Sequence, residues 1–303
     1  MLDAAIAVAR FLQFAPAAIL FGSSLFVFYG LKPPPSDLEW LRRMLFVAAA
    51  VALISSIGGI MLQAASLGGN AKDAVDAEVL RSLLTETSFG KVLALRVLLA
   101  VCALLVGFIN PKRFAVVVFT IGLALLASYA WTGHAAAEEG TAGAVHTASD
   151  VLHLLAAGIW IGALVPLMHL LGHTPMTNRA EDALYGLMRF SGIGFAVVAI
   201  LVLSGIVNSW FLIGPEHVVE LFTTAYGAVL LIKLALFGGM LILAAANRFK
   251  LVPNLEVELA KGGSPASALT ALRKSLLAEN ALAALVLLAV GFLGTLEPPA
   301  SLG

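Results

Sequence analysis

The chain has 303 residues, of which 60% are hydrophobic and 12% charged, and its formal net charge at neutral pH is zero. A typical soluble domain carries about 25% charged residues, so this composition, with a mean hydropathy of +0.99, excludes a soluble globule. The balanced charge offers no electrostatic basis for nucleic-acid binding. The single cysteine, Cys102, excludes an internal disulfide and any cysteine-based metal motif.

The apolar residues fall into eight runs, each long enough to cross a bilayer core, which takes about 20 residues. They lie at 5–31, 41–66, 90–109, 113–133, 148–171, 187–212, 223–247 and 271–294. The segment 70–89 has apolar residues at helical spacing and is predicted to be a short amphipathic helix on the membrane surface. The polar stretch 248–270 is predicted to be partly disordered. The sequence therefore predicts an all-α, polytopic membrane helix bundle surrounded by the lipid bilayer.

The positions of Lys and Arg predict the orientation of the bundle, because these residues are enriched in cytoplasmic loops. One edge of the predicted bundle holds twelve of the 18, namely Lys32, Arg42, Arg43, Lys112, Arg113, Arg179, Arg189, Arg248, Lys250, Lys261, Arg273 and Lys274. The other edge holds four, namely Arg10, Lys72, Arg81 and Lys91. The loops 133–147 and 213–222 carry neither residue type and fall at this second edge. The pattern predicts that both termini and the 133–147 loop face out.

The two halves of the chain share a pattern of similar residues in the same order. Shifts of 140, 146 and 137 residues align Gln13 with His153, Gly22 with Gly162, Gly59 with Gly205, Gly90 with Gly227, and Arg96 with Lys233. The pattern predicts two four-helix repeats, at 1–135 and 136–303. Because each unit has an even number of spans, the repeats run parallel to one another. Function can then lie where the copies differ, and the second repeat carries the histidines.

One stretch, His146-Thr-Ala-Ser-Asp150-Val-Leu-His153, runs from a polar loop directly into the fifth apolar run. At about 100° per residue, these two imidazoles and the carboxylate fall within an arc of about 60° on one helix face. Such a set suits a borderline metal such as copper, with the carboxylate either binding the ion or orienting a ring. The alternative is a hydrated helix end with a capping aspartate.

Two further residues are candidates for the same metal site. His134 ends the fourth span, so a short loop brings it to the depth of His153, and Met61 lies in the outer third of the second span. Imidazole followed by thioether suits copper that arrives as Cu(II) or Cu(I) and leaves as Cu(I), because thioether favours the reduced ion. Zinc would accept the same His and Asp ligands. The competing interpretation of Met61 is that it fills the core.

Three charged side chains, Arg96, Lys233 and Glu279, lie within predicted spans. A charge there costs about 3 kcal/mol on insertion scales, so each needs a partner or water. Lys233 and Glu279 reach similar predicted depths and are expected to pair, either in a polar or proton-coupled path or as a structural link between helices. Asn208, in the outer third of the sixth span, and Trp160 are further candidates for this path.

A second group of potential metal ligands lies at the opposite membrane edge. It consists of Met168, His169 and His173, and the two histidines are i, i+4 neighbours. The group is a candidate exit for a metal ion. The alternative is that these residues are ordinary interfacial side chains.

The linked pattern of these residues resembles the CopD/PcoD family of bacterial copper-resistance inner-membrane proteins. The matching segments are Gly133-His134-Ala-Ala, His146, His153-x6-Trp160-x-Gly162-Ala-Leu, Ser204-Gly205-x2-Asn208, Tyr226-Gly227-x5-Lys233, Asn247-Arg248 and Arg10-Phe-Leu-x8-Phe21-Gly22. The resemblance covers essentially the whole chain, and the His/Trp/Gly and Tyr-Gly/Lys patterns are its more specific parts.

The resemblance implies copper transport across the bacterial inner membrane, from periplasm to cytoplasm, alongside a periplasmic CopC-like copper-binding protein. It implies that His134, His146 and His153 bind the metal and that Asp150 supports them. In the inner membrane, the orientation predicted from Lys and Arg makes both termini periplasmic. The family pattern commonly has a histidine where Gln13 stands, so a ligand from the first span is missing here. No nucleotide-binding loop is present, so an uphill step needs a gradient or metal capture on the far side.

Two other functions remain open. His153-x6-Trp160-x-Gly162, followed two spans later by Lys233, also resembles the four-helix haem-binding protoporphyrinogen oxidase family, which implies haem b and an oxidoreductase. Haem in membranes is usually held by histidines that project into a helix bundle, and only His153 and His134 lie deep enough here. The third function is a copper-binding partner of periplasmic proteins that transports nothing. Under the copper interpretations the protein is not an enzyme.

Overall fold

The computed structural model describes residues 2–32, 38–106, 111–133, 140–172, 177–262 and 264–301. Within these residues the regular structure is entirely helical. The long helices are α1 Leu2–Gly30, α2 Glu39–Gly68, α4 Ser88–Val106, α5 Pro111–Ala127, α6 Gly140–Gly172, α7 Thr177–Leu212, α8 Ala225–Ala246 and α10 Ala266–Leu293. The shorter elements are η1 Ala71–Val75, α3 Ala77–Glu86, η2 Ser128–Thr132, η4 Pro215–Phe222, η5 Asn247–Leu251, α9 Val252–Ala260 and η6 Pro299–Ser301.

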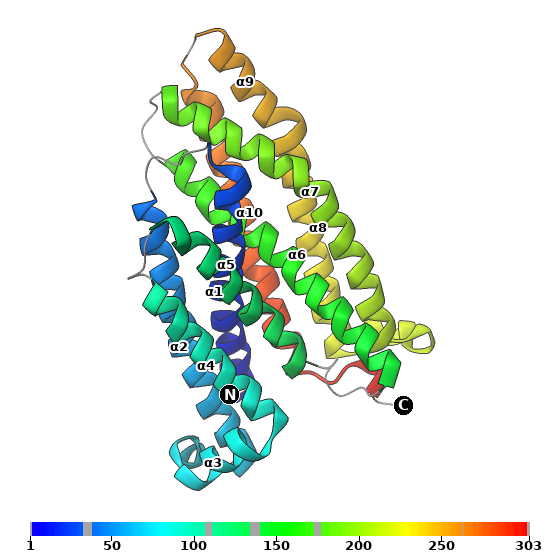
Figure 1. Cartoon of the computed structure of the whole chain (residues 1–303). Helices are drawn as coiled ribbons and strands as arrows, with labels where there is room; N and C mark the ends of the chain where they lie inside the picture. The colour runs from blue at the N-terminus through cyan, green and yellow to red at the C-terminus, as the bar shows by residue number, and fades with distance from the viewer. Residues whose placement is uncertain are drawn as a thin grey trace.

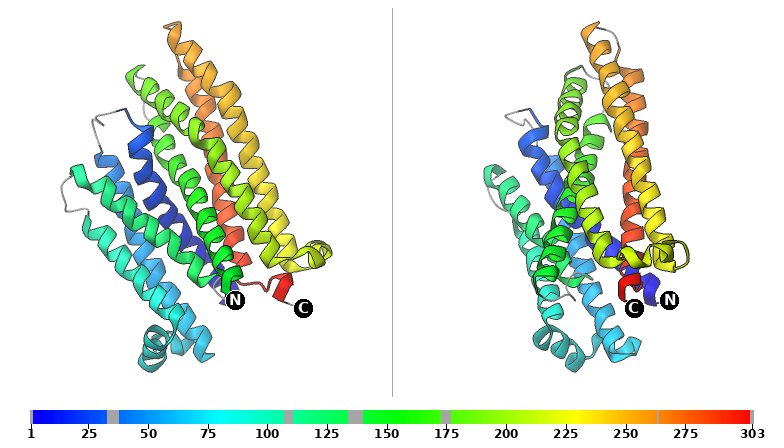
Figure 2. Two further views of the ribbon diagram at one scale, coloured as in Figure 1. Left: turned by 45° about the vertical axis from the view of Figure 1, so that its right-hand side comes forward. Right: turned by 90° about the vertical axis from the view of Figure 1, so that its right-hand side faces the viewer.

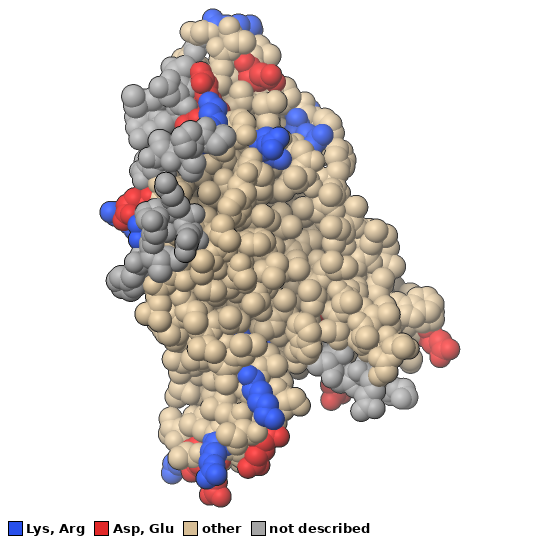
Figure 3. Space-filling model, viewed as in Figure 1, with Lys and Arg blue, Asp and Glu red and all other residues tan. Residues whose placement is uncertain are grey.

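Eight helical segments are long and apolar enough to cross a membrane, which confirms the predicted polytopic bundle. Figure 3 shows the consequence at the surface, where Lys, Arg, Asp and Glu gather at the two ends of the molecule and a broad uncharged band lies between them. Both chain termini lie at one end, here called the terminal end, and α9 projects from the other, here called the α9 end (Figures 1 and 2).

Two boundaries differ from the sequence prediction. Helix α6 begins at Gly140, so His146 lies within a helix rather than in the preceding loop. The prediction of partial disorder across 248–270 is wrong, because a π-helical turn at Asn247–Leu251 leads directly from α8 into α9. Val252, Leu255 and Leu259 recur at helical spacing and pack into the core, which explains why the helix continues past the charged residues of this stretch.

The segment between α2 and α4 is helical, as predicted. Asp76 caps α3 by accepting hydrogen bonds from the backbone amides of Glu78 and Val79, and Leu83 is the buried residue that anchors the helix. Such a cap satisfies amides that the first turn leaves unpaired. Its contact with the membrane surface stays a prediction.

Helices α1 and α6 cross at the centre of the bundle through small residues. A Cβ atom on Gly22 would lie 2.0 Å from the backbone oxygen of Gly158, and one on Gly162 would lie 2.4 Å from the oxygen of Ala18. The Ser23 hydroxyl donates a 2.6 Å hydrogen bond to the Gly162 oxygen. This is the small-residue contact that brings membrane helices together, and it joins the two hydrophobic cores on either side.

Matched positions in the two halves make matched contacts. Gly59 faces the Gln13 amide and Gly205 faces the His153 ring, so each glycine leaves room for the paired polar residue. The Thr87 hydroxyl accepts a 2.8 Å hydrogen bond from the Gly90 amide at the start of α4. Likewise, the Thr224 hydroxyl accepts a 3.1 Å bond from the Gly227 amide at the start of α8. These contacts support two four-helix repeats. The division of the chain into repeats at 1–135 and 136–303 stays a proposal.

Candidate metal site and buried polar groups

His146, Asp150 and His153, here called the His/Asp cluster, lie on α6 near the terminal end. The His146 side chain is buried, and its ring stacks on Phe211 of α7 with centroids 4.6 Å apart and an interplanar angle of 8°. An apolar ring on one face fixes the plane of the imidazole. The orientation of His146 is therefore set by α7 before any ion arrives.

Asp150 lies one helical turn from each histidine and interacts with charged or polar groups from two other helices. Asn208 of α7 donates a 3.4 Å hydrogen bond to its Oδ1 atom. The carboxylate also interacts electrostatically with His146 and with Lys233 of α8. Lys233 acts on His153 as well, so its charge faces the whole cluster. The predicted candidates Asp150, Asn208 and Lys233 are thus brought together.

The hydrogen bonds around His153 define which ring nitrogen is free. Its Nδ1 atom lies 2.9 Å from the Ser204 hydroxyl oxygen. Ser204 uses its only hydroxyl hydrogen to bond the Ile200 backbone oxygen at 2.5 Å, so it accepts from the imidazole. The proton then sits on Nδ1, and the Nε2 lone pair of His153 is available to a metal ion.

The described residues do not assemble the full predicted ligand set. No group of three His, Cys, Asp or Glu side chains among them lies close enough to hold one metal ion. His134 lies outside the described residues. Met61 is 37% exposed on α2, which places it at the surface of the bundle rather than in the core. The predicted site therefore stays a prediction in which His153 and Asp150 are the best placed members.

The polar residues of the second half follow seven-residue spacing on two helices. His146, His153 and Trp160 are spaced by seven on α6. Tyr226, Lys233 and Met240 are spaced by seven on α8, and Asn247 at the start of η5 continues this spacing. Seven residues make nearly two turns, so each set shares one helix face and advances about 10 Å per step. Met240 is buried in the same apolar cluster as Trp160. Met240 was not among the residues predicted from the sequence, although its seven-residue spacing from Lys233 and Asn247 is visible there.

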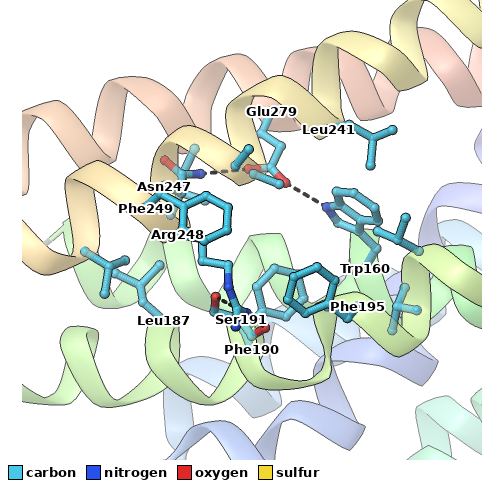
Figure 4. Close-up of a pocket in the computed structure, with 17 residues that line it drawn as sticks. Trp160, Leu187, Phe190, Ser191, Phe195, Leu241, Asn247, Arg248, Phe249 and Glu279 are labelled. Carbon is cyan, nitrogen blue, oxygen red and sulfur yellow. Dashed lines mark hydrogen bonds between the residues drawn. The ribbon is translucent and has the colours of Figure 1, made fainter.

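Glu279 of α10 lies between Trp160 and Asn247, the two members of this stripe that Figure 4 labels. Trp160 Nε1 donates a 2.7 Å hydrogen bond to Glu279 Oε1, and Asn247 Nδ2 donates a 3.0 Å bond to Oε2. The predicted Lys233–Glu279 pair is therefore wrong. Lys233 lies two levels from Asn247 on α8, about 21 Å along the axis. Glu279 bonds Asn247 and therefore lies nearer the α9 end than Lys233 does.

A cavity of about 230 Å³ opens beside the Glu279 carboxylate between α6, α7, α8 and α10. Its walls are mainly apolar, and Phe190 and Phe195 of α7 line it (Figure 4). Arg248 donates hydrogen bonds to the Ser191 hydroxyl, at 2.9 Å, and to the Ser191 backbone oxygen, and it lies over the Phe195 ring. No His, Met or Cys is among the described residues that line this cavity, so it offers copper no soft ligand.

Arg96 is buried in the first half and has the partners that its position requires. Its guanidinium donates hydrogen bonds to the hydroxyl and backbone oxygens of Ser128, both at 3.0 Å, and to the Thr132 hydroxyl. It also lies over the Tyr129 ring, 4.0 Å from the centroid. These contacts tie α4 to η2 and indicate a structural role.

The candidate exit lies at the α9 end. His169 stacks on Trp40 of α2 with ring centroids 4.1 Å apart and an interplanar angle of 11°. Met168 packs against the core of the second half. His173 lies outside the described residues, so the exit stays a prediction.

Several contacts that complete these groups are visible only in the tertiary structure. Ser204 orients His153, Tyr226 interacts electrostatically with Asp150, and Asn247 bonds Glu279. Each lies far from its partner in sequence. The family-like segments of the sequence contain all three residues but do not indicate these partners.

Comparison with known proteins gives consistent matches. The family model described as copper resistance protein D-like, N-terminal domain, matches residues 1–144, and the model described as copper resistance protein D matches residues 186–293. No solved structure matches the chain.

Among curated proteins, the chain is 34% identical to copper resistance protein D of Pseudomonas syringae pv. tomato, over 97% of each chain. It is 30% identical to the inner membrane protein YebZ of Escherichia coli K12, over 95% of this chain and 97% of that protein. It is 31% identical to the copper transport protein CutJ of Bacillus subtilis 168, over 78% of this chain and 45% of that protein.

Proposed function

The chain belongs to the copper resistance protein D family, and from this we propose that it moves copper ions across the inner membrane from a binding site at the His/Asp cluster. The observation that carries the proposal is the geometry of His153. Its Nδ1 atom is held by Ser204, which leaves Nε2 as a pre-oriented ligand. The names of relatives that describe copper resistance and copper transport support the same cargo.

Copper is the substrate of this site rather than a resident cofactor. His153 and Asp150 bind it first, with His134 as the proposed further nitrogen ligand. Imidazole and carboxylate accept Cu(II) and Cu(I), so the site does not discriminate between the two oxidation states by ligand type. The positive charge of Lys233 near Asp150 limits the time for which an ion stays bound, since like charges repel.

The route we propose follows the facing stripes of α6 and α8. Below His153 the core is apolar, and Met240 is the buried thioether there. A thioether stabilises Cu(I) relative to Cu(II), so the Met240 level favours passage of copper that enters the route as Cu(I). The Glu279 carboxylate, held by Trp160 and Asn247, follows at the next level. His169 at the α9 end is the candidate exit.

The direction of transport follows from the orientation of the bundle. The excess of Lys and Arg at the α9 end supports a topology with that end in the cytoplasm and both termini in the periplasm. The His/Asp cluster then faces the periplasm, where a CopC-like copper-binding protein is the proposed donor. Net import is driven by a gradient or by copper capture in the cytoplasm.

The proposal is tested by copper flux into proteoliposomes that contain the purified protein. His153→Ala is expected to reduce flux to the background of empty vesicles, because it removes the oriented ligand. His217→Ala is the matched control, since it removes a histidine from η4 at the same end of the bundle. Unchanged flux in His153→Ala would end the claim that this cluster is the transport site.

The same preparation separates the two alternative functions. Copper binding without flux in the wild-type protein would instead indicate a binding partner that transports nothing. A Soret absorption band in the purified protein would indicate haem b. The copper proposal expects neither result.

A further inference from the structure

A second polar cavity, of about 80 Å³, lies in the first half of the bundle near the terminal end. It is enclosed by α1, α2, α4 and η2, and its described lining includes Arg10, Gln13, Gln63, Arg96 and Thr132. Liquid water occupies about 30 Å³ per molecule, so the space holds one small polyatomic group or two to three waters. The metal-site proposal does not use this cavity.

Two arginines face the cavity from different helices at similar depth. Arg10 lies six residues from the start of the α1 span and Arg96 eight residues from the start of α4. These offsets correspond to depths of about 9 and 12 Å. The two guanidinium groups are close enough for their positive charges to repel. Such an arrangement inside a membrane protein is unfavourable unless an anion or acid compensates it.

Arg10 has free hydrogen-bonding capacity. Unlike Arg96, which is bonded to Ser128 and Thr132, Arg10 makes no hydrogen bond or ion pair with any residue that the structure describes. Its position is nevertheless defined, because Gly294 at the end of α10 makes room for it. A Cβ atom on Gly294 would lie 1.3 Å from Arg10 Nη1. The guanidinium is therefore held in place by packing while its donors stay available.

No protein carboxylate compensates these charges within the described lining. That lining contains neither Asp nor Glu. Asp150 approaches the cavity at Gly133, one of the lining residues, where its Oδ2 atom would lie 3.7 Å from a built Cβ atom. Asp150 itself is engaged by Asn208 and Lys233. Among the described lining residues, the cavity thus presents donors from Arg10, Arg96 and Gln63 and no acid to match them.

We propose that this cavity binds a small oxyanion, a phosphate or carboxylate group, between the guanidinium groups of Arg10 and Arg96. Arginine suits this ligand because its planar fork donates two parallel hydrogen bonds to an oxyanion. Gln63 adds an amide donor to the same space. The group comes either from a free anion or from the headgroup of a lipid, since both present the same oxygens. The proposed anion site lies across Gly133 from the His/Asp cluster. The two neighbouring sites prefer ligands of opposite charge.

The test uses the purified full chain in a sugar-based detergent and a buffer free of phosphate and carboxylate. Its thermal unfolding midpoint is followed during titration with inorganic phosphate at constant ionic strength. A second titration uses a short-chain phosphatidylglycerol. We expect a saturable rise in the midpoint in at least one titration, because a ligand of the folded state stabilises it.

Arg10→Gln is expected to weaken that apparent affinity at least about tenfold, as loss of a charge-assisted contact does. Arg81→Gln is the matched control, because it removes an exposed charge from α3 at the same end and should leave the affinity unchanged. Gly294→Ala, which keeps the charge but displaces the Arg10 guanidinium, should also weaken binding.

The outcomes separate the two sources of the ligand. A rise in the unfolding midpoint with phosphate alone identifies the ligand as a free anion. A rise with phosphatidylglycerol alone identifies it as a lipid headgroup. No saturable rise with either probe, or equal rises in the wild type and Arg10→Gln, would overturn the proposal. If Arg10→Gln does not fold, Arg10→Lys, which keeps the charge but loses the fork, replaces it with the same expectation of weaker binding.

Discussion

The two halves of the molecule place opposite chemistry at matched positions. The 140-residue shift that aligns Gln13 with His153 also aligns Arg10 with Asp150, and Arg96 aligns with Lys233. The second half therefore has a histidine and an acid beside its cation, whereas the first half has an amide and two cations. Gln13 donates to the Ser55 backbone oxygen, and Arg96 bonds η2. One scaffold thus offers a cation site in one half and an electropositive cavity in the other.

The comparison shows how a repeated bundle can change function through few residues. The helix crossings and helix starts use the same glycines and threonines in both halves. The side chains that project into the polar spaces differ in charge and type. The predictions below convert one half toward the other or remove a group that only the second half has.

The largest effect is expected from Asp150→Arg, which gives the second half the charge pattern of the first. A second positive charge beside Lys233 repels a copper ion, so copper affinity should fall at least about a hundredfold. Competition titration with a chromogenic copper chelator measures the change. Glu216→Arg, the same charge reversal on exposed η4, should bind like the wild type. Equal affinities in both variants would show that Asp150 is not near the ion.

Ser204→Ala should lower copper affinity by roughly 10- to 100-fold, as loss of a ligand's orienting partner does. The change frees the His153 ring without removing any ligand. Ser149→Ala is the control, because the Ser149 hydroxyl bonds the Ser204 backbone rather than the imidazole. The chelator titration applies here too, and an affinity equal to that of Ser149→Ala would refute the proposed tautomer.

Met240→Leu should reduce copper flux about tenfold while binding at the His/Asp cluster stays unchanged. The substitution keeps the volume of the buried side chain and removes only the thioether, so folding should tolerate it. Flux into proteoliposomes is compared with that of Met188→Leu, which alters an exposed methionine on α7. Wild-type copper flux in Met240→Leu would show that the route does not pass Met240 on α8.

The smallest effect is expected from Trp160→Phe, which removes one hydrogen bond to Glu279 and keeps the aromatic ring. Stability should fall by about 1–3 kcal/mol, because a buried carboxylate loses a donor. Chemical unfolding measured by helical circular dichroism tests this. No loss of stability would mean that water replaces the indole at Glu279.

The sequence was sufficient for features that depend on local pattern. Long apolar runs predicted all eight spans, and the angular spacing of His146, Asp150 and His153 predicted their common helix face. Contacts between helices that are distant in sequence could not be predicted from local pattern. The hydrogen bonds of Glu279 to Trp160 and Asn247 depend on how α10 packs against its neighbours, so they were not predicted. The free nitrogen of His153 depended on Ser204, which lies 51 residues away in the chain.

The most direct test of the central claim is anomalous diffraction at the copper edge from crystals of the copper-loaded protein. The account predicts a peak at a bonding distance of about 2.0–2.1 Å from His153 Nε2, as for other metal–imidazole bonds. The same peak should be absent in His153→Gln. A copper peak elsewhere in the bundle, with His153 Nε2 unbound, would contradict the account.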